Sequence, residues 1–348
     1  MSRPIVVKLG TSLVVSAHGR ARRSLLAARA KEIAELVDAH TPVCVVSSGA
    51  IALGLSRLGV SHRPRSVPKL QAASALGQAR LQGAWDAALA KVGLRAGQVL
   101  LTAADIADRA TYVNARNALQ AILDLGRAVP IINENDATAT DEITFGDNDS
   151  LAAHAATLLD ARLLILLTEV EGLYTRAPGS PGAELITDGG SAAQAELAGK
   201  TALGSGGMQS KVLAAEMAAA AGIPTVIAAG TENDVLVPIV AGEPRGTRFQ
   251  GEERQVSAFK LWLRFGKPVS GRLTVDAGAR NAVVTGGSSL LAVGIVSCEG
   301  AFEAGAGIEL VGPDGKVFAK GLAGTSSAEI ATRRRGLEAV HRDRLVVY

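Results

Sequence analysis

Lys8 stands near the end of a short aliphatic run and is followed by LGTS, which supplies Gly10, Thr11 and Ser12. An ammonium group and several backbone N–H groups at one turn can converge on a single anion, and this geometry suits a phosphate. Taken alone, the segment is explained more simply by an edge lysine followed by a turn. Its interpretation therefore depends on the rest of the chain.

A second glycine-rich segment, residues 203–211 with the sequence LGSGGMQSK, places Gly206 and Gly207 before a helical pattern that begins near Met208. Glycine lets the backbone approach a phosphate at a helix N-terminus, and Lys211 then falls on the first turn. The segment lacks the GK[ST] ending of a P-loop, so we exclude that motif. By itself, a glycine run of this kind is more often a flexible connection than a nucleotide site.

Polar side chains are densest in residues 131–136, INENDA, and 145–153, FGDNDSLAA, close to expected strand and helix ends. Helix capping by Asp149 accounts for one or two of them, but not for all. Convergent acids and amides are what a site for a small zwitterion needs, with acids for its ammonium group and amide or hydroxyl donors for its carboxylate. The residues concerned are Asn133, Glu134, Asn135, Asp136, Asp147, Asn148 and Asp149.

The five histidines are scattered along the chain, and none lies in these loops. A reaction without a general base fits this pattern. A carboxylate substrate is already ionised at neutral pH, so it needs only positioning and charge neutralisation for phosphoryl transfer. Lys8 and Lys211 can supply the positive charge.

Short aliphatic runs alternate with longer helical patterns over the first 250 residues. Continuous aliphatic strands separated by helices predict a mostly parallel sheet covered on both faces by helices. Ligands collect beyond the carboxyl ends of such strands, which is where the polar segments fall. The expected strands are PIVVKL, PVCVVS, QVLL, AVPIIN, RLLILL and PTVIAA, and the expected helices lie near residues 22–40, 49–58, 68–91, 111–125, 149–160 and 207–221.

The pattern changes around residues 243–270, where long periodic helical stretches end. From about residue 270 the chain has short apolar runs separated by glycine-rich turns, of which GPDGK is the clearest, and this predicts a small β-rich domain. We therefore expect an α/β domain over residues 1–250, a linker over 251–269 and a β-rich domain over 270–348.

Composition excludes several classes of protein. The net charge of +3 is too small to indicate a polyanion partner for the whole chain. Cys44 and Cys298 lie in apolar surroundings without a CxxC or His-rich neighbourhood, which argues against a metal site or a disulfide scaffold. No apolar run approaches a membrane span, and the start MSRPIVVKLG lacks the apolar stretch of a signal peptide. We expect a cytoplasmic protein with no membrane partner.

Taken in order, the motifs resemble the amino-acid kinase family, and within it the members that phosphorylate the side-chain carboxylate of glutamate. The resemblance covers essentially the whole chain, because the C-terminal region is similar to a PUA domain. Any one motif is weak, but their order makes the match specific. The motifs are VVKLGTS, VSSGAIALG, QVLLT, NARNAL, PIINENDA, GDND, LLT followed by GLY, and GGMQSK.

The resemblance implies roles for individual residues, with ATP as the phosphoryl donor and L-glutamate as the acceptor. Lys8 and Lys211 would stabilise the transferring phosphoryl group, and Asp149 would orient their ammonium groups. The residues expected to hold glutamate are Ser48, Gly49, Asn133, Asp136 and Asn148. The residues expected to contact ATP are Lys8, Gly10, Thr168, Glu169, Ser205, Gly206, Gly207, Met208, Gln209, Ser210 and Lys211.

The resemblance also implies Mg²⁺ held mainly on phosphate oxygens, so no dedicated set of metal ligands is expected. It further implies the first step of proline synthesis from glutamate, feedback inhibition by proline, a homo-oligomer, and functional coupling to glutamyl phosphate reductase. Two residues depart from the common pattern. Glu169 stands where many relatives have aspartate, which leaves the adenine or ribose side of the site open, and Ser205 replaces a common threonine.

Two other functions stay open at this point. An aspartate kinase would share the family, but INENDA with GDND, and a β-rich C-terminal region in place of regulatory ACT repeats, favour glutamate. PUA domains elsewhere often bind RNA. Residues 270–348, however, carry nine basic and eight acidic residues, and this near balance gives poor support for a surface that follows a phosphate backbone. We expect no strong nucleic-acid binding.

Overall fold

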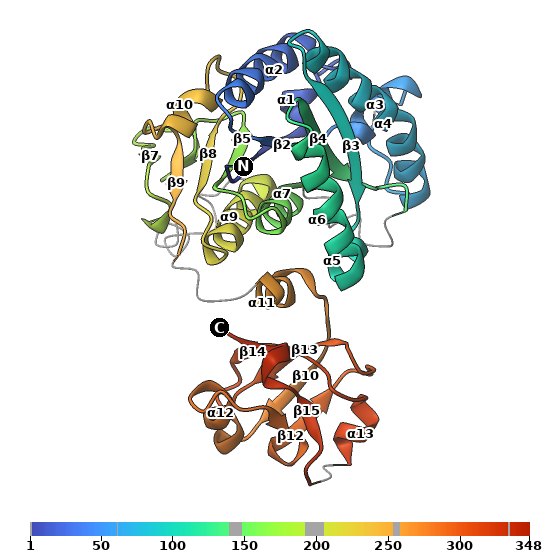
Figure 1. The fold of residues 1–348 in the computed structure, drawn as a ribbon, viewed down its shortest axis with the longest axis vertical. Helices are drawn as coiled ribbons and strands as arrows, with labels where there is room; N and C mark the ends of the chain where they lie inside the picture. Colours follow the sequence, from blue (N-terminus) through green and yellow to red (C-terminus); the bar gives the residue numbers. More distant parts are fainter. Residues whose placement is uncertain (1, 61, 139–147, 192–204, 253–257, 333–334) are drawn as a thin grey trace. The chain divides into compact units, whose positions relative to one another are not determined.

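The computed structural model describes residues 2–60, 62–138, 148–191, 205–252, 258–332 and 335–348. Two units share the chain (Figure 1). The first comprises Met1–Asp105 and Arg109–Arg254, and the second comprises Ile106–Asp108 and Gln255–Tyr348.

A twisted sheet forms the centre of the first unit (Figure 1). Its strands among the described residues are β1 (Ile5–Leu9), β2 (Val43–Ser47), β3 (Arg95–Leu101), β4 (Ala128–Glu134), β5 (Leu163–Thr168), β8 (Thr225–Ala229) and β9 (Thr247–Phe249). They are ordered β3-β4-β2-β1-β5-β8-β9, all parallel to their neighbours except β9, which closes the edge antiparallel to β8. Because β1 lies in the middle, every one of its residues is buried.

Helices cover both faces of this sheet (Figure 1). Those described up to residue 250 are α1 (Thr11–Val14), α2 (Arg23–Asp38), α3 (Ala50–Arg57), α4 (Val67–Ala90), α5 (Ala103–Ala107), α6 (Arg109–Asp124), α7 (Asn148–Leu158), α9 (Ser205–Ala220) and α10 (Leu236–Ala241). On one face, Ile33 of α2 and Trp85 of α4 share a core with Ile5, Val7 and Leu9 of β1. On the other face, α6, α7 and α9 pack against β4, β1 and β5. The expected parallel sheet between two helical layers is confirmed.

The helices α3 and α4 pack with their backbones in direct contact. A Cβ atom at Gly54 would lie 1.7 Å from the carbonyl oxygen of Ala73, and one at Gly77 would lie 1.8 Å from that of Ala50. Any side chain at either glycine would force the helices apart. The contact therefore holds the start of α3, which follows β2, firmly against the face of α4 that carries Ser74.

A buried ion pair joins α2 to the segment before α10. Arg29 Nη2 lies 2.7 Å from Glu32 Oε1, and the two side chains are only 1% and 3% exposed. Arg29 also donates to the carbonyl oxygen of Glu232 at 2.5 Å, while Glu32 accepts a hydrogen bond from the backbone N–H of Leu236 at 2.6 Å. The pair thus holds the loop between β8 and α10 at two points.

Several short elements were not predicted. The hairpin β6 (Leu173–Tyr174) and β7 (Leu185–Ile186) follows β5, and α10 and β9 follow β8. Each is six residues or fewer. Such lengths are too short to show a periodic pattern in the sequence.

The second unit is built around a sheet with the order β12-β10-β13-β14-β16, beside the two-stranded pair β11-β15. Its described strands are β10 (Val269–Val275), β11 (Leu290–Leu291), β12 (Ile295–Glu299), β13 (Gly307–Val311), β14 (Val317–Leu322), β15 (Glu338–Val340) and β16 (Leu345–Val347). The GPDGK segment forms the turn between β13 and β14, with Gly312 N–H donating to Lys316 O at 2.9 Å. The expected β-rich C-terminal part is confirmed.

Helices in the second unit differ from the sequence prediction. Residues 281–284, expected in a strand, belong to α12 (Ala277–Val284), so that expectation was wrong. Asp276 starts this helix by accepting a hydrogen bond from Ala279 N–H at 2.7 Å, and Ser326 caps α13 (Ser327–Ala331) in the same way. In α12, the cap outweighs the β propensity of Val283 and Val284.

The segment expected to be a linker also contains structure. Residues 258–266 form α11 (Ala258–Leu261) and a π-helical turn (Trp262–Gly266). The side chains of Leu261 and Leu263 are buried, at 1% and 0% exposure. Burial of these apolar side chains stabilises the segment. The segment is too short to show a long helical pattern in the sequence.

Candidate active site

Lys8 lies in the central strand and faces the layer that contains α7 and α9. Side chains alternate between the two faces of a strand. Since Ile5, Val7 and Leu9 enter the core under α2, Lys8 must point the other way. Its side chain is only 5% exposed. A buried ammonium group needs a partner of opposite charge.

Asp149 at the start of α7 is that partner, and it binds a second lysine as well. Lys8 Nζ lies 2.5 Å from Asp149 Oδ1, and Lys211 Nζ of α9 lies 3.0 Å from Asp149 Oδ2. The hydroxyl of Ser210 donates to the same Oδ2 at 2.9 Å. One carboxylate thus bridges two ammonium groups whose lysines are far apart in the sequence of the first unit. We call Lys8, Asp149 and Lys211 the lysine cluster.

The lysine cluster carries excess positive charge. Burial alone would raise the pKa of Asp149, but the charges and hydrogen bonds of Lys8 and Lys211 outweigh burial and hold the pKa below its ordinary value. The carboxylate is therefore ionised at neutral pH, and two ammonium groups surround it. This balance favours an incoming anion such as a phosphate.

The start of α9 leaves space beside the lysine cluster. Lys211 Nζ donates to the carbonyl oxygen of Gly207 at 2.9 Å, so its side chain folds back along the first turns of the helix. Among the described residues, a Cβ atom at Gly207 would meet nothing within 4 Å, and one at Gly10 would meet only Lys8 Nζ, at 3.9 Å. Packing of the described residues therefore requires neither glycine. The open space allows a phosphate to approach the N–H groups at the N-terminus of α9.

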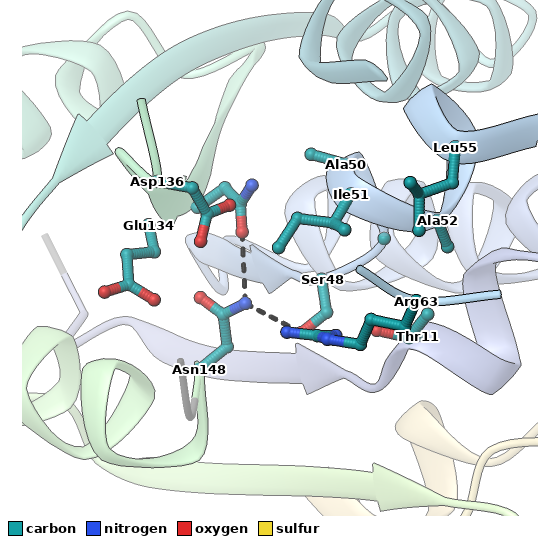
Figure 2. Close-up of a pocket in the computed structure, with 12 residues that line it drawn as sticks. Thr11, Ser48, Ala50, Ile51, Ala52, Leu55, Arg63, Glu134, Asp136 and Asn148 are labelled. Carbon is teal, nitrogen blue, oxygen red and sulfur yellow. Dashed lines mark hydrogen bonds between the residues drawn. The ribbon is translucent and has the colours of Figure 1, made fainter. Parts of the chain in front are cut away.

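A cavity of about 240 Å³ lies beyond the carboxyl ends of β1, β2 and β4 (Figure 2). Asn148 lines it and precedes Asp149 on α7, so the cavity adjoins the lysine cluster. Figure 2 shows polar groups of β4 and α7 facing apolar side chains of α3. The lining residues are Thr11, Ser48, Gly49, Ala50, Ile51, Ala52, Leu55, Arg63, Asn133, Glu134, Asp136 and Asn148.

A chain of amide side chains forms the inner wall of the cavity. Asn148 Nδ2 donates to Ser48 Oγ at 2.7 Å and to Asn133 Oδ1 at 3.0 Å (Figure 2). Asn133 Nδ2 in turn donates to Gln78 Oε1 of α4 at 2.9 Å. The buried Oδ1 of Asn148 accepts no hydrogen bond from any described residue. A ligand with hydrogen-bond donors would satisfy it.

Asp136 follows β4 and supplies a negative charge to the cavity. It is 7% exposed, and Ser74 of α4 donates to its Oδ2 at 2.7 Å. Burial raises the pKa of Asp136 above its ordinary value, although the Ser74 hydrogen bond and the charge of Arg63 oppose the rise. An ammonium group bound beside this carboxylate would restore its ordinary ionisation.

Gly49 forms the corner between β2 and α3. Its φ of 119° lies in the region that favours glycine, and a Cβ atom there would lie 2.9 Å from Val15 Cγ2. Ser48 N–H donates to the carbonyl oxygen of Leu9 at 3.1 Å, which ties this corner to β1. The backbone therefore needs glycine at this position in order to place Ser48 in the cavity wall.

Thr168 and Glu169 lie apart from this cavity. Thr168 ends β5 and is partly buried, whereas Glu169 is exposed just beyond it. A second cavity, of about 270 Å³, opens near the ends of β5 and β8, but neither residue lines it. Its lining residues are Glu171, Leu185, Ala228, Ala229, Glu232, Val235, Arg245 and Gly246.

The remaining predicted ATP contacts lie in α9. Ser205 and Gly206 begin this helix, Met208 is partly buried and Gln209 is exposed. Asp147 of the acidic segment lies outside the described residues. Among the residues that are described, no group of three or more His, Cys, Asp or Glu side chains could hold a metal ion. No described helix has the length and apolar character needed to cross a membrane.

Sequence analysis gave no role to Arg63, Ser74 and Gln78. Ser74 and Gln78 stand one helical turn apart on α4, so a polar pair on one helix face was the available signal. Arg63 lies between α3 and α4 in the segment HRPR. No pattern in that segment distinguishes it from neighbouring surface arginines.

Comparison with known proteins agrees with this arrangement. Residues 3–229 match the amino acid kinase family, and residues 271–343 match the PUA domain. Glutamate 5-kinase of Burkholderia cenocepacia is 43% identical over 99% of this chain and 98% of its own length. Glutamate 5-kinase of Methylobacillus flagellatus is 42% identical over 99% and 97%.

Among solved structures, UMP kinase from Bacillus anthracis is similar with a TM-score of 0.49 and 16% identity, covering 72% of this chain and 96% of that one. The family match covers most of the first unit, and the curated relatives align from end to end. The chain therefore belongs to the amino acid kinase family and carries a C-terminal PUA domain.

Proposed function

We propose that this kinase transfers the terminal phosphoryl group of ATP to the side-chain carboxylate of L-glutamate, forming ADP and L-glutamyl 5-phosphate. The names of the relatives that align over nearly the whole chain support this substrate. The observation that carries the proposal is the position of the lysine cluster directly beside a cavity lined with amides and acids.

Glutamate would bind in this cavity with its ammonium group at Asp136. The chain of amides from Gln78 to Asn148 fixes the side chains that face the ligand. The reacting carboxylate would lie near the hydroxyl of Ser48, which accepts from Asn148 and can still donate its own proton, on the side toward Asp149. This places it next to the positive charge of Lys8 and Lys211, which is where the phosphoryl group must arrive.

Phosphoryl transfer then needs no protein base. An oxygen of the ionised side-chain carboxylate attacks the terminal phosphorus, a new O–P bond forms, and the bond to ADP breaks. The acceptor has no proton to remove. Lys8 and Lys211 stabilise the charge on the transferring oxygens, and Asp149 keeps both ammonium groups in place. Burial lowers the pKa of His154 on α7 to about 4, so this histidine is neutral at pH 7. His154 also does not line the cavity.

The nucleotide would bind on the α9 side of the lysine cluster. The open space at Gly10 and Gly207 fits a phosphate chain. Thr168, which ends β5, and Glu169, which follows it, would lie on the side of the nucleotide base and ribose. Mg²⁺ bound with ATP would neutralise charge on the phosphate oxygens.

The wider roles follow from the same family relationship. They are a cytoplasmic enzyme at the first step of proline synthesis, inhibition by proline, assembly into a homo-oligomer, and coupling to glutamyl phosphate reductase. For the PUA domain, we propose no strong nucleic-acid binding. The place in proline synthesis, the inhibition by proline and the coupling to the reductase depend on glutamate being the substrate.

An assay with two acceptors tests the proposal. The purified protein, ATP and Mg²⁺ are incubated with L-glutamate or L-aspartate, and ADP release is measured together with the acyl hydroxamate that forms when hydroxylamine traps the product. We expect glutamate-dependent ADP and hydroxamate in equal amounts. Activity on aspartate alone, or ADP release without hydroxamate, would refute the proposal.

A further inference from the structure

Arg63 is the one cation among the described residues that line the cavity in which we propose that glutamate binds. The described residues also give Arg63 no hydrogen bond or ion pair, and its side chain is exposed. Its guanidinium group is therefore available to a ligand at the cavity.

The charges of glutamate set a requirement that the amide wall does not meet. Glutamate has two carboxylates and one ammonium group. The reacting carboxylate lies toward Lys8 and Lys211 under the proposed function, and the ammonium group lies at Asp136. Among the described side chains that line the cavity, only that of Arg63 carries a positive charge for the carboxylate that does not react. A guanidinium group can bind a carboxylate through two parallel N–H donors.

Arg63 and Asp136 meet a second requirement as groups of opposite charge at one cavity. In an amino acid, the ammonium group and the non-reacting carboxylate are attached to the same carbon atom. Their partners in a binding site must therefore be neighbouring groups of opposite charge. Arg63 and Asp136 line the same cavity and interact electrostatically, since the charge of Arg63 opposes the rise in the pKa of Asp136.

We propose that Arg63 binds the non-reacting carboxylate of glutamate and so selects an α-amino acid over other carboxylates. This inference rests on the proposed function and adds a specificity residue to it. Arg63 is exposed where it lines the cavity, whereas Asn133 and Asn148 of the amide wall are buried. It acts on binding and not on the transfer step, which takes place at the lysine cluster.

The test compares L-glutamate with its α-amide, in which the non-reacting carboxylate is replaced by a neutral amide. We expect Arg63→Ala to raise KM for glutamate by about 10- to 100-fold, the usual effect of losing a hydrogen bond between charged groups. The kcat should stay within about threefold, because uniform binding is lost. For the α-amide, KM or the inhibition constant should differ by less than about threefold between wild type and variant, because the interaction is already absent.

Matched variants separate this role from general effects. Arg65→Ala removes a second exposed arginine that does not line the cavity, so it should leave KM for glutamate unchanged. Arg63→Lys keeps the charge and should recover part of the affinity. Thermal unfolding of all variants should match wild type, because both arginines are exposed.

Three results would overturn the inference. They are an unchanged KM for glutamate in Arg63→Ala, an equal rise in KM for glutamate and its α-amide, and an equal rise in Arg65→Ala. If the wild-type protein phosphorylates no glutamate, the proposed function itself fails and this inference fails with it. Wild-type activity with an unaffected Arg63→Ala variant refutes the inference alone.

Discussion

Among its described residues, the first unit contains two buried ion clusters that are built differently. Arg29 and Glu32 come from one helix, carry one charge of each sign, and bind the backbone of the loop before α10. The lysine cluster joins side chains from β1, α7 and α9, and has two positive charges for one negative charge. The first cluster is electrically neutral, whereas the second has a charge that a ligand can neutralise.

The pKa shifts of the two acids reflect this difference. Burial dominates at Glu32 and raises its pKa in spite of Arg29. At Asp149, two lysines overcome burial, and the pKa is lowered. The comparison teaches that burial of an ion cluster does not by itself indicate function. The excess charge and the open space beside it distinguish a site from a structural tie.

The largest effect is expected from the lysine cluster. Lys211→Ala and Lys8→Ala should each lower kcat by at least about 10³-fold, because each removes charge stabilisation that is needed mainly in the transition state. Folding should be retained, since Asp149 keeps one lysine in either variant. Coupled ADP assays and thermal unfolding check the two expectations. Turnover at the wild-type level in either variant would contradict the assignment.

Substitution in the ion pair Arg29–Glu32 should lower stability and leave kcat unchanged. Arg29→Met should lower the free energy of unfolding by about 3–5 kcal/mol, because Glu32 would stay buried without its counter-charge. The kcat of the folded fraction should be unchanged. Urea unfolding followed by circular dichroism measures the first quantity. The double variant Arg29→Met/Glu32→Leu is the control and should recover much of the stability. If Arg29→Met lost as much kcat as the lysine variants, the two clusters would not differ in function.

Asp136→Asn tests the binding end of the site. It should raise KM for glutamate by about 10- to 100-fold with a smaller change in kcat, because the partner of the substrate ammonium group loses its charge. The folded-state pKa of Asp136 is raised, so kcat/KM for glutamate in wild type should fall as the pH drops through that raised value. The variant should lack this decline.

The same raised pKa has a consequence for stability. Asp136 contributes most favourably to folding below its ordinary pKa, and that contribution is lost as the pH rises through its raised folded-state value. Unfolding curves of wild type and Asp136→Asn should therefore diverge across this interval. If wild type and Asp136→Asn shared one pH profile of kcat/KM and one pH profile of stability, Asp136 would not titrate in the cavity.

The smallest effect is expected at Gly207. Gly207→Ala should stabilise the protein by up to about 1 kcal/mol, because alanine has a higher helix propensity than glycine, but should raise KM for ATP by about tenfold by filling the phosphate space. Gly83→Ala in α4 is a matched control, since a Cβ atom there also meets nothing within 4 Å. It should give a similar gain in stability with no change in KM. Equal KM values for the two variants would place the nucleotide elsewhere.

Much of the fold follows from local pattern. The runs that form β1, β2 and β5 are mostly aliphatic because both faces of these strands are buried. Short elements such as α12 and β9 depend on caps and neighbouring strands, so the sequence carries little signal for them. A local cap starts α12, whereas pairing with the distant strand β8 determines β9.

The site is only partly readable from the sequence. Lys8 and Asp149 attract attention because charge at a strand or helix end is unusual next to apolar runs. Their distance from Lys211 depends on how β1, α7 and α9 pack, which no local pattern encodes. Arg63 could not be found at all, because its role depends on which cavity its segment borders.

The position of β1 also has a consequence for how the protein becomes active as it folds. This strand pairs with β2 on one side and with β5 on the other, and the lysine cluster closes only when α9 joins. Contacts between distant parts of a chain form late and slow the folding of a domain. During synthesis, the chain up to β4 already contains most of the cavity lining but neither Asp149 nor Lys211. Recovery of kinase activity after refolding should therefore lag behind the recovery of helix content, and it marks the completion of the longest-range contacts.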